Sequence, residues 1–340
     1  MGQKLKVAVI GLGTMGKVHT NMWSNIPQAE LVAVHSLDVE KMKAVAARYG
    51  AAPVQQIEEL LASDVDVVDI CLPTYLHKPY IIKAAEAGKH VISEKPLGLN
   101  AREAESIIQV CEKYGVSLFV AQVVRFFPEY AAVKEQIADG RIGKPGVVRL
   151  SRGGAAPIGW ENWYADDAKS GGLILDSMIH DFDWLRWTFG DVKRVMARCV
   201  SQSSTDGHRA YALVTLRMED GTIGHVEGTW AHQTFKTSFE IAGDQGMLAY
   251  DSQESAPLEV SLHSDENGAV KAGVSVPESP LNESPYQREL AHFADCLLTG
   301  KTPIVTAYDA LKAVEISEAA IASAMSGRPV ELENERGGDR

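Results

Sequence analysis

The sequence has few cysteines and no long apolar run. Its four cysteines, Cys71, Cys111, Cys199 and Cys296, are widely scattered, with no CxxC pair and no zinc-like spacing. Such usage is typical of reduced thiols in a cytosolic protein. The first apolar run, in KLKVAVI, is too short for a signal peptide, and the others stop well short of a bilayer span. We therefore expect a cytoplasmic protein with no membrane partner.

Positive charge is also in short supply. Lys and Arg number 33 against 45 Asp and Glu, which gives a formal charge of −12. An acidic surface repels phosphate backbones, so we do not expect nucleic acid as a partner. Hydrophobic residues make up 45% and charged residues 23%, the usage of an ordinary globular protein. A chain of 340 residues is long enough for two domains with separate cores.

A glycine-rich turn directly follows the first apolar run. KLKVAVI predicts a strand buried on both faces, GLGTMG follows it, and KVHTNMWSN predicts a helix. Gly11, Gly13 and Gly16 thus form a GxGxxG in strand–turn–helix context. The first glycine permits the tight turn, the second lets a pyrophosphate approach the backbone, and the third allows close helix–strand packing. The alternative is a glycine turn without a ligand, and the pattern that follows argues against it.

Strands and helices alternate through residue 122. Strands are expected in ELVAVHS, VDVVDICLP, KHVISEKP and VSLFVAQ, and helices in DVEKMKAVAARYG, LHKPYIIKAAEAG and NAREAESIIQVCEKYG. Such alternation predicts a parallel, doubly wound sheet that binds ligands outside the carboxyl ends of its strands. Those ends carry GLGTMG, CLPTYLH, SEKP and AQVVRF. Glu94 and Lys95 of SEKP are therefore expected at the mouth of a nucleotide crevice.

The residue expected to bind the adenosine ribose does not distinguish the two nicotinamide nucleotides. Dinucleotide-binding domains usually carry an acid there, about 20 positions past the glycines. Ser36 occupies this place. Serine would not repel a 2′-phosphate, but no arginine follows at once and Asp38 is close by. NAD and NADP therefore both remain candidates.

Beyond Gln122 the pattern becomes that of an α+β domain. PEYAAVKEQIADGRIGKP predicts a helix and turn, GVVRLSR a strand, and YALVTLRMEDGTIGHVEGTWAH a hairpin turning at Asp220-Gly221. Helical patterns return over roughly 286–298 and 306–326. We expect an open-faced, predominantly antiparallel sheet with helices on one side and the other side free for self-association, hence a homodimer or homotetramer.

The most informative stretch of the second half predicts one helix over residues 173–189. Asp176 and His180 are four residues apart, which would place them on one face of that helix. A helical histidine is more often a core residue than a base, and Asp183 could complete a divalent metal site instead. The neighbouring aspartate and the double glycine before it favour catalysis.

Together these motifs resemble the glucose–fructose oxidoreductase, inositol dehydrogenase and rhizopine-catabolism (Gfo/Idh/MocA) family, in its inositol 2-dehydrogenase-like form. The similarity rests on GLGTMG, on CLPTYLH, on the EKP of residues 94–96 and on the GG…D…H pattern of residues 171–180. It implies a Rossmann domain over 1–124 and a substrate-binding and oligomerisation domain over 125–340, whose C-terminal helices could return to the first. It also implies NAD(P)-dependent oxidation of a sugar or cyclitol hydroxyl.

The resemblance assigns catalysis to Lys95, Asp176 and His180 and implies no metal. His180 would take the proton of the substrate hydroxyl. Asp176 would orient the His180 ring or bind a neighbouring substrate hydroxyl. The Lys95 ammonium would stabilise the alkoxide character that develops on the substrate oxygen. The residues expected to bind the cofactor are Gly11, Gly13, Thr14, Met15, Gly16, Ser36, Pro73, Thr74, His77, Glu94 and Gln122. The residues expected to bind substrate are Lys95, Arg125, Trp163, Asp176, His180 and His232.

Some of these residues could have a structural role instead of a role in binding. Arg125 could be an ion-pair partner, and Trp163 could pack in the core instead of stacking on a sugar or nicotinamide edge. Glu94 could form a salt bridge with Lys95 instead of contacting the cofactor.

The leading interpretation is a dehydrogenase that transfers a hydride between a ring hydroxyl and NAD or NADP. The alternatives are a sugar oxidoreductase with tightly bound NADP, a non-catalytic nucleotide sensor, and a reductase of imines or biliverdin-type substrates. The presence of Lys95, Asp176 and His180 argues against the last two.

Overall fold

The computed structural model describes residues 4–204, 207–253 and 284–333. The chain divides into two compact units, Met1–Phe126 with Pro280–Val314 and Phe127–Ser279 with Glu315–Arg340. Part of the C-terminal third therefore belongs to the first unit, while the domain bounds drawn from the sequence stay a prediction. Among the described residues, no helix combines the length and apolarity needed to cross a membrane.

The first unit is built on a parallel sheet of six strands in the order β3-β2-β1-β4-β5-β6. Its strands are β1 (Leu5–Ile10), β2 (Ala29–His35), β3 (Ala52–Pro53), β4 (Val67–Ile70), β5 (His90–Glu94) and β6 (Leu118–Ala121). The strand order reverses direction between β1 and β4, and doubly wound sheets bind dinucleotides at such a point. The Rossmann sheet expected from the sequence is confirmed.

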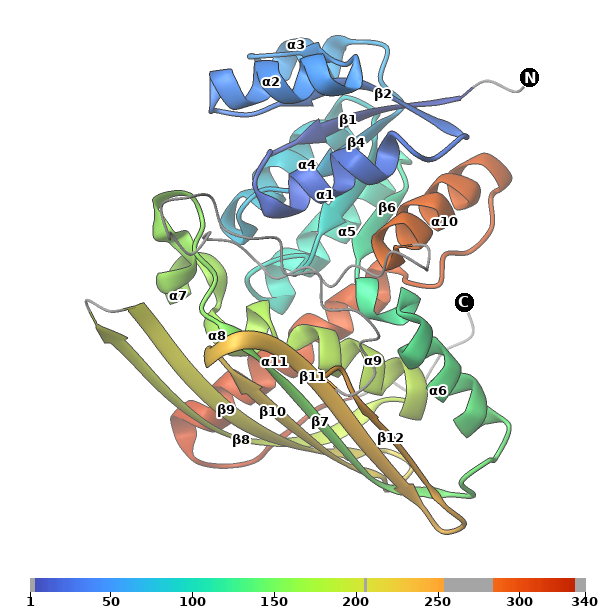
Figure 1. Cartoon of the computed structure of the whole chain (residues 1–340), viewed down its shortest axis with the longest axis vertical. Helices are drawn as coiled ribbons and strands as arrows, with labels where there is room; N and C mark the ends of the chain where they lie inside the picture. Colours follow the sequence, from blue (N-terminus) through green and yellow to red (C-terminus); the bar gives the residue numbers. More distant parts are fainter. Residues whose placement is uncertain (1–3, 205–206, 254–283, 334–340) are drawn as a thin grey trace. The chain divides into compact units, whose positions relative to one another are not determined.

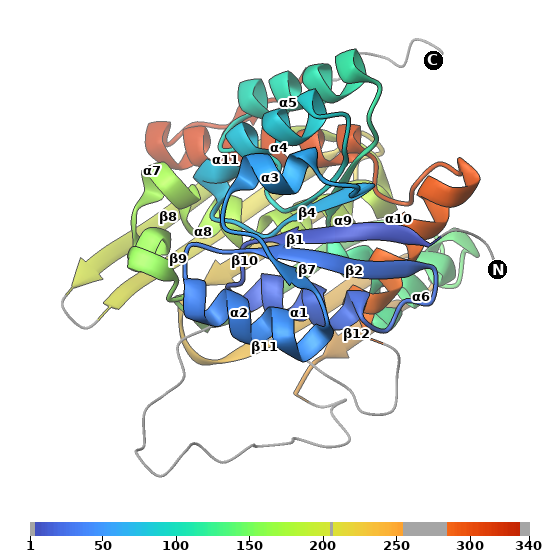
Figure 2. The ribbon, with the colours of Figure 1, turned by 90° about the horizontal axis from the view of Figure 1, so that it is seen from above.

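Helices cover both faces of this sheet, with α1 and α2 on one face and α3, α4 and α5 on the other (Figure 2). Their bounds are α1 (Thr14–Trp23), α2 (Val39–Tyr49), α3 (Ile57–Ala62), α4 (His77–Glu86) and α5 (Ala101–Tyr114), with short 3₁₀ turns η1 (Thr74–Leu76) and η2 (Val123–Phe126). Local sequence sets the ends of α5. Asn100 accepts the Glu103 N–H at 2.9 Å before it, and Gly115 follows it at φ 65°.

Helix α10 (Pro285–Thr299) belongs to the first unit, although in the sequence it comes after Phe127–Ser279 of the second unit. It contacts α1 and η2. Its Phe293 ring centroid lies 5.0 Å from that of Phe119 in β6, the edge strand of the parallel sheet. A contact over such a sequence distance leaves no local pattern, so only tertiary packing determines it.

The second unit contains a mixed sheet in the order β12-β11-β7-β10-β9-β8-β13 (Figure 1). Its strands are β7 (Pro145–Ala155), β8 (Val192–Ser204), β9 (Gly207–Met218), β10 (Ile223–Thr229), β11 (Ala231–Gly243), β12 (Met247–Asp251) and β13 (Val330–Glu331). All neighbouring pairs are antiparallel except β7 with β10. The predicted hairpin between β9 and β10 is confirmed, with Gly221 at φ 94° in its turn.

Helices pack on one face of this sheet. They are α6 (Pro128–Ala138), α7 (Asp167–Ser170), α8 (Gly172–Asp176), α9 (Ile179–Phe189) and the C-terminal part of α11 (Ala307–Ser326), with a 3₁₀ turn η3 (Trp160–Ala165). Along β9, Ala212 and Val214 are buried whereas Tyr211 and Leu213 are exposed. This alternation is that of a sheet with one packed and one open face, as expected from the sequence.

The single helix expected over residues 173–189 is wrong in one respect, because the chain forms two helices, α8 and α9. The break lies at Ser177 and Met178, where the Met178 N–H donates to the Leu173 carbonyl five residues back, at 3.1 Å. Met178 is fully buried and packs against Gly228 of β10, where a Cβ atom would lie 2.5 Å from the Met178 Cγ. A wider turn of this kind inside a helix often marks a functional site.

Candidate active site

The glycine turn after β1 forms a cradle that only glycine allows. Gly11 has φ 91°, and a Cβ there would lie 2.4 Å from the Cys71 carbonyl oxygen. A Cβ at Gly16 would lie 1.8 Å from the Gly11 oxygen. At Gly13, by contrast, a Cβ would meet nothing within 4 Å. Two glycines therefore close the turn, and the third leaves open space in front of α1.

The N-terminus of α1 fits the pyrophosphate of a dinucleotide. The helix begins at Thr14 and Met15, has no acidic residue in its first turn and has no side-chain cap. Its first N–H groups and the positive end of its dipole suit an anion.

The end of β2 presents a hydroxyl where an acid is more usual. Ser36 accepts the Asp38 N–H at 3.3 Å. The Asp38 carboxylate accepts the Lys41 N–H at 3.0 Å and so caps α2. Asp38 is thereby engaged in the fold, and the Ser36 hydroxyl directly follows the last residue of the strand, His35.

The loop after β4 is joined to the EKP segment by a buried histidine. His77 is fully buried, with Nδ1 2.8 Å from the Pro96 oxygen and Nε2 2.8 Å from the Leu72 oxygen. Burial lowers the pKa of His77, so a neutral ring donates to one of these carbonyls at a time. Pro73 precedes the turn η1, and Thr74 within it is buried. Cofactor contacts by these residues stay a prediction.

Lys95 follows directly on β5, and its peptide bond to Pro96 is cis. Glu94 is 6% exposed, and its Oε2 accepts the Lys95 N–H at 3.1 Å. The other carboxylate oxygen of Glu94 lies 3.2 Å from Nε2 of His19. Glu94 thus lies beside a histidine that the sequence did not suggest as its neighbour, although Nε2 of His19 makes no hydrogen bond within the described part of the chain.

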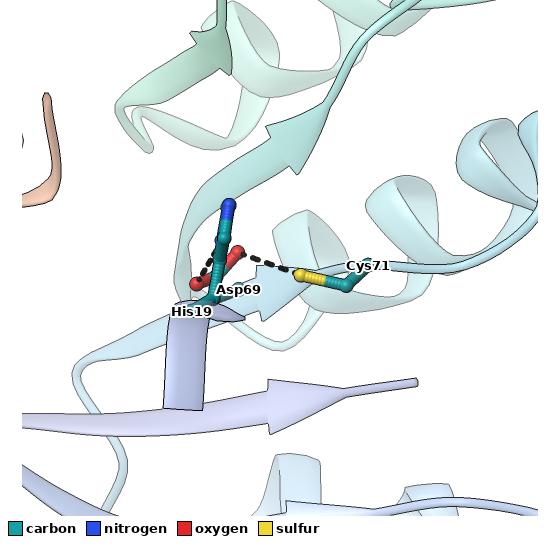
Figure 3. Close-up of side chains that lie close together, drawn as sticks. All are labelled: His19, Asp69 and Cys71. Carbon is teal, nitrogen blue, oxygen red and sulfur yellow. Dashed lines mark hydrogen bonds and ion pairs between the residues drawn. The ribbon is translucent and has the colours of Figure 1, made fainter. Parts of the chain in front are cut away.

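His19 belongs to a buried polar cluster that sequence reasoning missed (Figure 3). Its Nδ1 lies 2.9 Å from Oδ2 of Asp69, which also accepts the Trp23 Nε1–H at 2.7 Å. The Cys71 thiol lies 3.6 Å from the other Asp69 oxygen. One signal was available, namely an aspartate inside VDVVDI, a strand predicted to be buried on both faces.

Gln122 and Arg125 follow β6 in different environments. Gln122 is fully buried, and neither its amide oxygen nor its nitrogen has a hydrogen-bond partner within the described part of the chain. Such an amide suits a polar group of a bound ligand. Arg125 is buried, donates to the Ile304 oxygen at 2.7 Å and pairs with Asp309 at 3.3 Å. Arg125 thus forms an ion pair, which was the structural alternative to substrate binding, and its contact with substrate stays a prediction.

In the second unit, Asp176 ends α8 and His180 lies in the first turn of α9. Asp176 is 8% exposed and His180 is half-buried. The residue after His180, Asp181, forms a buried two-point pair with Arg152 of β7, with both N···O distances 2.8 Å. This pair anchors the first turn of α9 to the sheet. The sequence did not reveal it, because the partners lie on separate elements.

The predicted substrate residues Trp163 and His232 lie in or beside a pocket of the second unit. The pocket has a volume of about 680 Å³, and its polar and aromatic lining residues are Asn162, Tyr164, Arg209, Trp230, His232 and Gln233. Trp163 stacks on Tyr164 with ring centroids 3.8 Å apart. His232 packs where a Cβ on Gly153 would lie 2.3 Å from its Nδ1. Aromatic faces with a few polar groups suit a polyhydroxylated ring.

The fold and these sites define an oxidoreductase with a dinucleotide-binding unit. The chain belongs to the Gfo/Idh/MocA family, since the "Oxidoreductase family, NAD-binding Rossmann fold" matches residues 5–122 and the "Oxidoreductase family, C-terminal alpha/beta domain" matches residues 134–332. The predicted family, fold class and nicotinamide cofactor are confirmed.

Similar proteins cover nearly the whole chain. The scyllo-inositol 2-dehydrogenase (NAD(+)) of Bacillus subtilis (strain 168) is 31% identical over 99% of this chain and 98% of its own. The myo-inositol 2-dehydrogenase of Thermotoga maritima is 28% identical over 97% of this chain and 99% of its own. The crystal structure of GenD2 from gentamicin A biosynthesis, in complex with NAD, has a TM-score of 0.86 at 28% identity and covers 98% of both chains.

Proposed function

We propose that the chain is an NAD-dependent dehydrogenase that oxidises a ring hydroxyl of an inositol-like cyclitol or of a sugar. One observation carries the proposal: Lys95 at the end of β5 occurs in the same chain as the Asp176 and His180 pair at the α8–α9 junction. The names of the Bacillus and Thermotoga relatives support the substrate class.

In the proposed reaction, the three residues have different roles toward one substrate hydroxyl. NAD, when bound, supplies the hydride acceptor. His180 takes the hydroxyl proton, because an imidazole titrates near neutrality. Asp176 orients the histidine or binds a neighbouring hydroxyl. Lys95 stabilises the negative charge that develops on the substrate oxygen as its proton leaves.

The segment after β2 supports NAD over NADP. The residues from Ser36 to Lys41 include Asp38 and Glu40, against one lysine. Their net charge is −1, which disfavours a 2′-phosphate. No arginine occurs in this segment to bind that phosphate.

The open face of the second sheet supports self-association. Val200 of β8 and Tyr211 of β9 are cross-strand neighbours and are 70% and 43% exposed, and Leu213 is 42% exposed. We propose that this apolar patch meets the same patch of a second copy. The proposal also retains the cytoplasmic location expected from the cysteine usage.

The proposed function is tested by a substrate screen. The purified chain is given NAD or NADP with a panel of inositols, aldoses and deoxy sugars, and the absorbance of reduced nicotinamide is followed. We expect an inositol or aldose to reduce NAD with a kcat/KM at least about tenfold above that with NADP. Nucleotide binding without turnover of any ring polyol would contradict the proposal.

A further inference from the structure

The pocket of the second unit is positively charged, although the chain as a whole is acidic. The described residues that line it include Arg209 and His232 but no aspartate or glutamate. The whole chain, by contrast, has 45 acidic residues against 33 Lys and Arg. A concave site whose charged groups share one sign concentrates ligands of the opposite sign. The pocket therefore favours a ligand with an anionic group.

The guanidinium group of Arg209 is available to such a ligand. Arg209 lies near the start of β9 and is exposed. Other arginines of the same unit pair with acids, as Arg152 does with Asp181 and Arg149 with Glu240. Arg209 has no acidic partner and no side-chain hydrogen bond among the residues that the structure describes. Its planar fork can therefore form a two-point contact with a carboxylate or a phosphate.

One strand that lines the pocket also anchors the turn of the proposed base. Arg152 of β7 pairs with Asp181, the residue after His180, at 2.8 Å. Ala155, three residues further along β7, lines the pocket. Three residues of a strand span about 10 Å. The pocket therefore begins within about 10 Å of the arginine that anchors the turn of His180.

A second strand places Arg209 beside the same junction. Gly228 of β10 packs against Met178, which lies between α8 and α9. Trp230, two residues further on, lines the pocket and donates its N–H to the Ala210 oxygen at 2.8 Å. Arg209 directly precedes Ala210. The cation thus lies on the strand next to the one that supports the junction of the proposed catalytic pair.

The neutral polar groups of the pocket suit the hydroxyls of a ring. Asn162 and Gln233 line it, and their amides can both donate to and accept from a hydroxyl. Asn162 has φ 51°, and its N–H donates to the Gly159 oxygen at 3.0 Å, so a left-handed turn fixes its place. Trp163 packs on this turn, where a Cβ at Gly159 would lie 2.5 Å from its Nε1. The pocket thus combines neutral groups for a ring with a cation for a charged substituent.

We infer that the substrate of the proposed dehydrogenase carries an acid group on its ring, and that Arg209 selects this substrate by pairing with the acid group. The inference rests on the proposed function, in which a sugar or cyclitol meets Asp176 and His180 of this unit. It adds a requirement that a neutral inositol or aldose does not meet. A carboxylate and a phosphate share the chemistry that Arg209 recognises.

The binding of matched neutral and acidic ligands tests this inference without turnover. The full-length chain is titrated by calorimetry in the presence of NADH, so that no sugar can be oxidised. The neutral ligands are glucose, galactose and myo-inositol. Their acidic partners are glucuronate, galacturonate, glucose 6-phosphate and myo-inositol 1-phosphate. We expect at least one acid to bind at least about tenfold more tightly than its neutral partner, because hydrogen bonds between charged groups are the stronger ones.

Two arginine variants locate the preference. Arg209→Gln keeps a polar side chain but removes the charge, and we expect it to weaken binding of the preferred acid at least about tenfold. Binding of the neutral partner should stay within about twofold, since it has no charge to pair with Arg209. Arg141→Gln is the matched control, because Arg141 is an exposed arginine of the same unit outside the pocket. We expect this variant to bind both ligands as the parent chain does.

The outcomes separate the two acid groups and the two proposals. A preference for a uronate identifies the group as a carboxylate, and a preference for a sugar or inositol phosphate identifies it as a phosphate. If no acid binds more tightly than its neutral partner, or if Arg209→Gln keeps the preference, the inference is overturned. An equal loss in Arg141→Gln would assign the preference to general surface charge and would overturn it too. Because binding is measured without turnover, failure of the substrate screen would leave this result intact.

Discussion

At the scale of single residues, buried ion pairs hold the segments from which the proposed catalytic groups project. Nε2 of His19 lies 3.2 Å from Glu94, the residue before Lys95, and the pair of Arg152 with Asp181 anchors the turn that carries His180. A buried pair adds little net stability over apolar packing, but removing one partner leaves an uncompensated charge. These pairs are therefore better explained by orientation than by stability.

Two arginines of the same strand allow this idea to be tested. Arg152→Met leaves the buried Asp181 without its arginine partner. We expect the free energy of unfolding to fall by about 3–5 kcal/mol. Arg149 of β7 pairs with Glu240 at the surface, where the side chains are 57% and 43% exposed. Arg149→Met should therefore lower the free energy of unfolding by less than about 1 kcal/mol. Urea unfolding measures both, and equal losses would show that the buried pair has no special role.

At the scale of elements, the sequence predicted the parts that local patterns determine. Strand–turn–helix alternation and the glycine spacing predicted the parallel sheet and the turn at Gly11, because both depend on neighbouring residues. The break between α8 and α9 was missed, because it depends on Met178 packing against Gly228 of β10. The contact of His19 with Asp69 was missed because α1 and β4 meet only once the order of the sheet is known.

The α8–α9 junction should be sensitive to its contact with β10. Gly228→Ala places a methyl group 2.5 Å from the Met178 Cγ, so Met178 must shift between Asp176 and His180. We expect kcat to fall at least about tenfold, because small displacements of catalytic groups are costly. The affinity for NAD, measured by fluorescence titration, should not change.

A second glycine of β10 is the matched control for this substitution. A Cβ at Gly224 would lie no closer than 3.4 Å to Leu185. Gly224→Ala should therefore keep kcat within about twofold of the original chain, since the added methyl makes ordinary contacts. If both alanine variants had the same kcat, the junction would not be the sensitive element.

At the scale of the whole molecule, the open face of the second sheet should determine the oligomeric state. An exposed apolar patch on an acidic chain is typical of a protein–protein interface. We expect the chain to be a dimer or tetramer by light scattering, and Tyr211→Glu with Leu213→Glu to give monomers. Lys43→Glu, at an exposed position of α2 in the first unit, should leave the assembly intact. A monomeric parent chain would rule out this role for the patch.

The most direct measurement for the whole account is the turnover of Lys95→Met on the best substrate of the screen. If Lys95 stabilises the developing alkoxide, kcat should fall by at least about 100-fold, as for other electrostatic groups of active sites. The dissociation constant for NAD should change by less than about threefold. Lys78→Met, a lysine of α4 outside the proposed site, should behave as the parent chain. A Lys95→Met variant with unchanged kcat, or one that loses NAD binding by the same factor, would contradict the assignment.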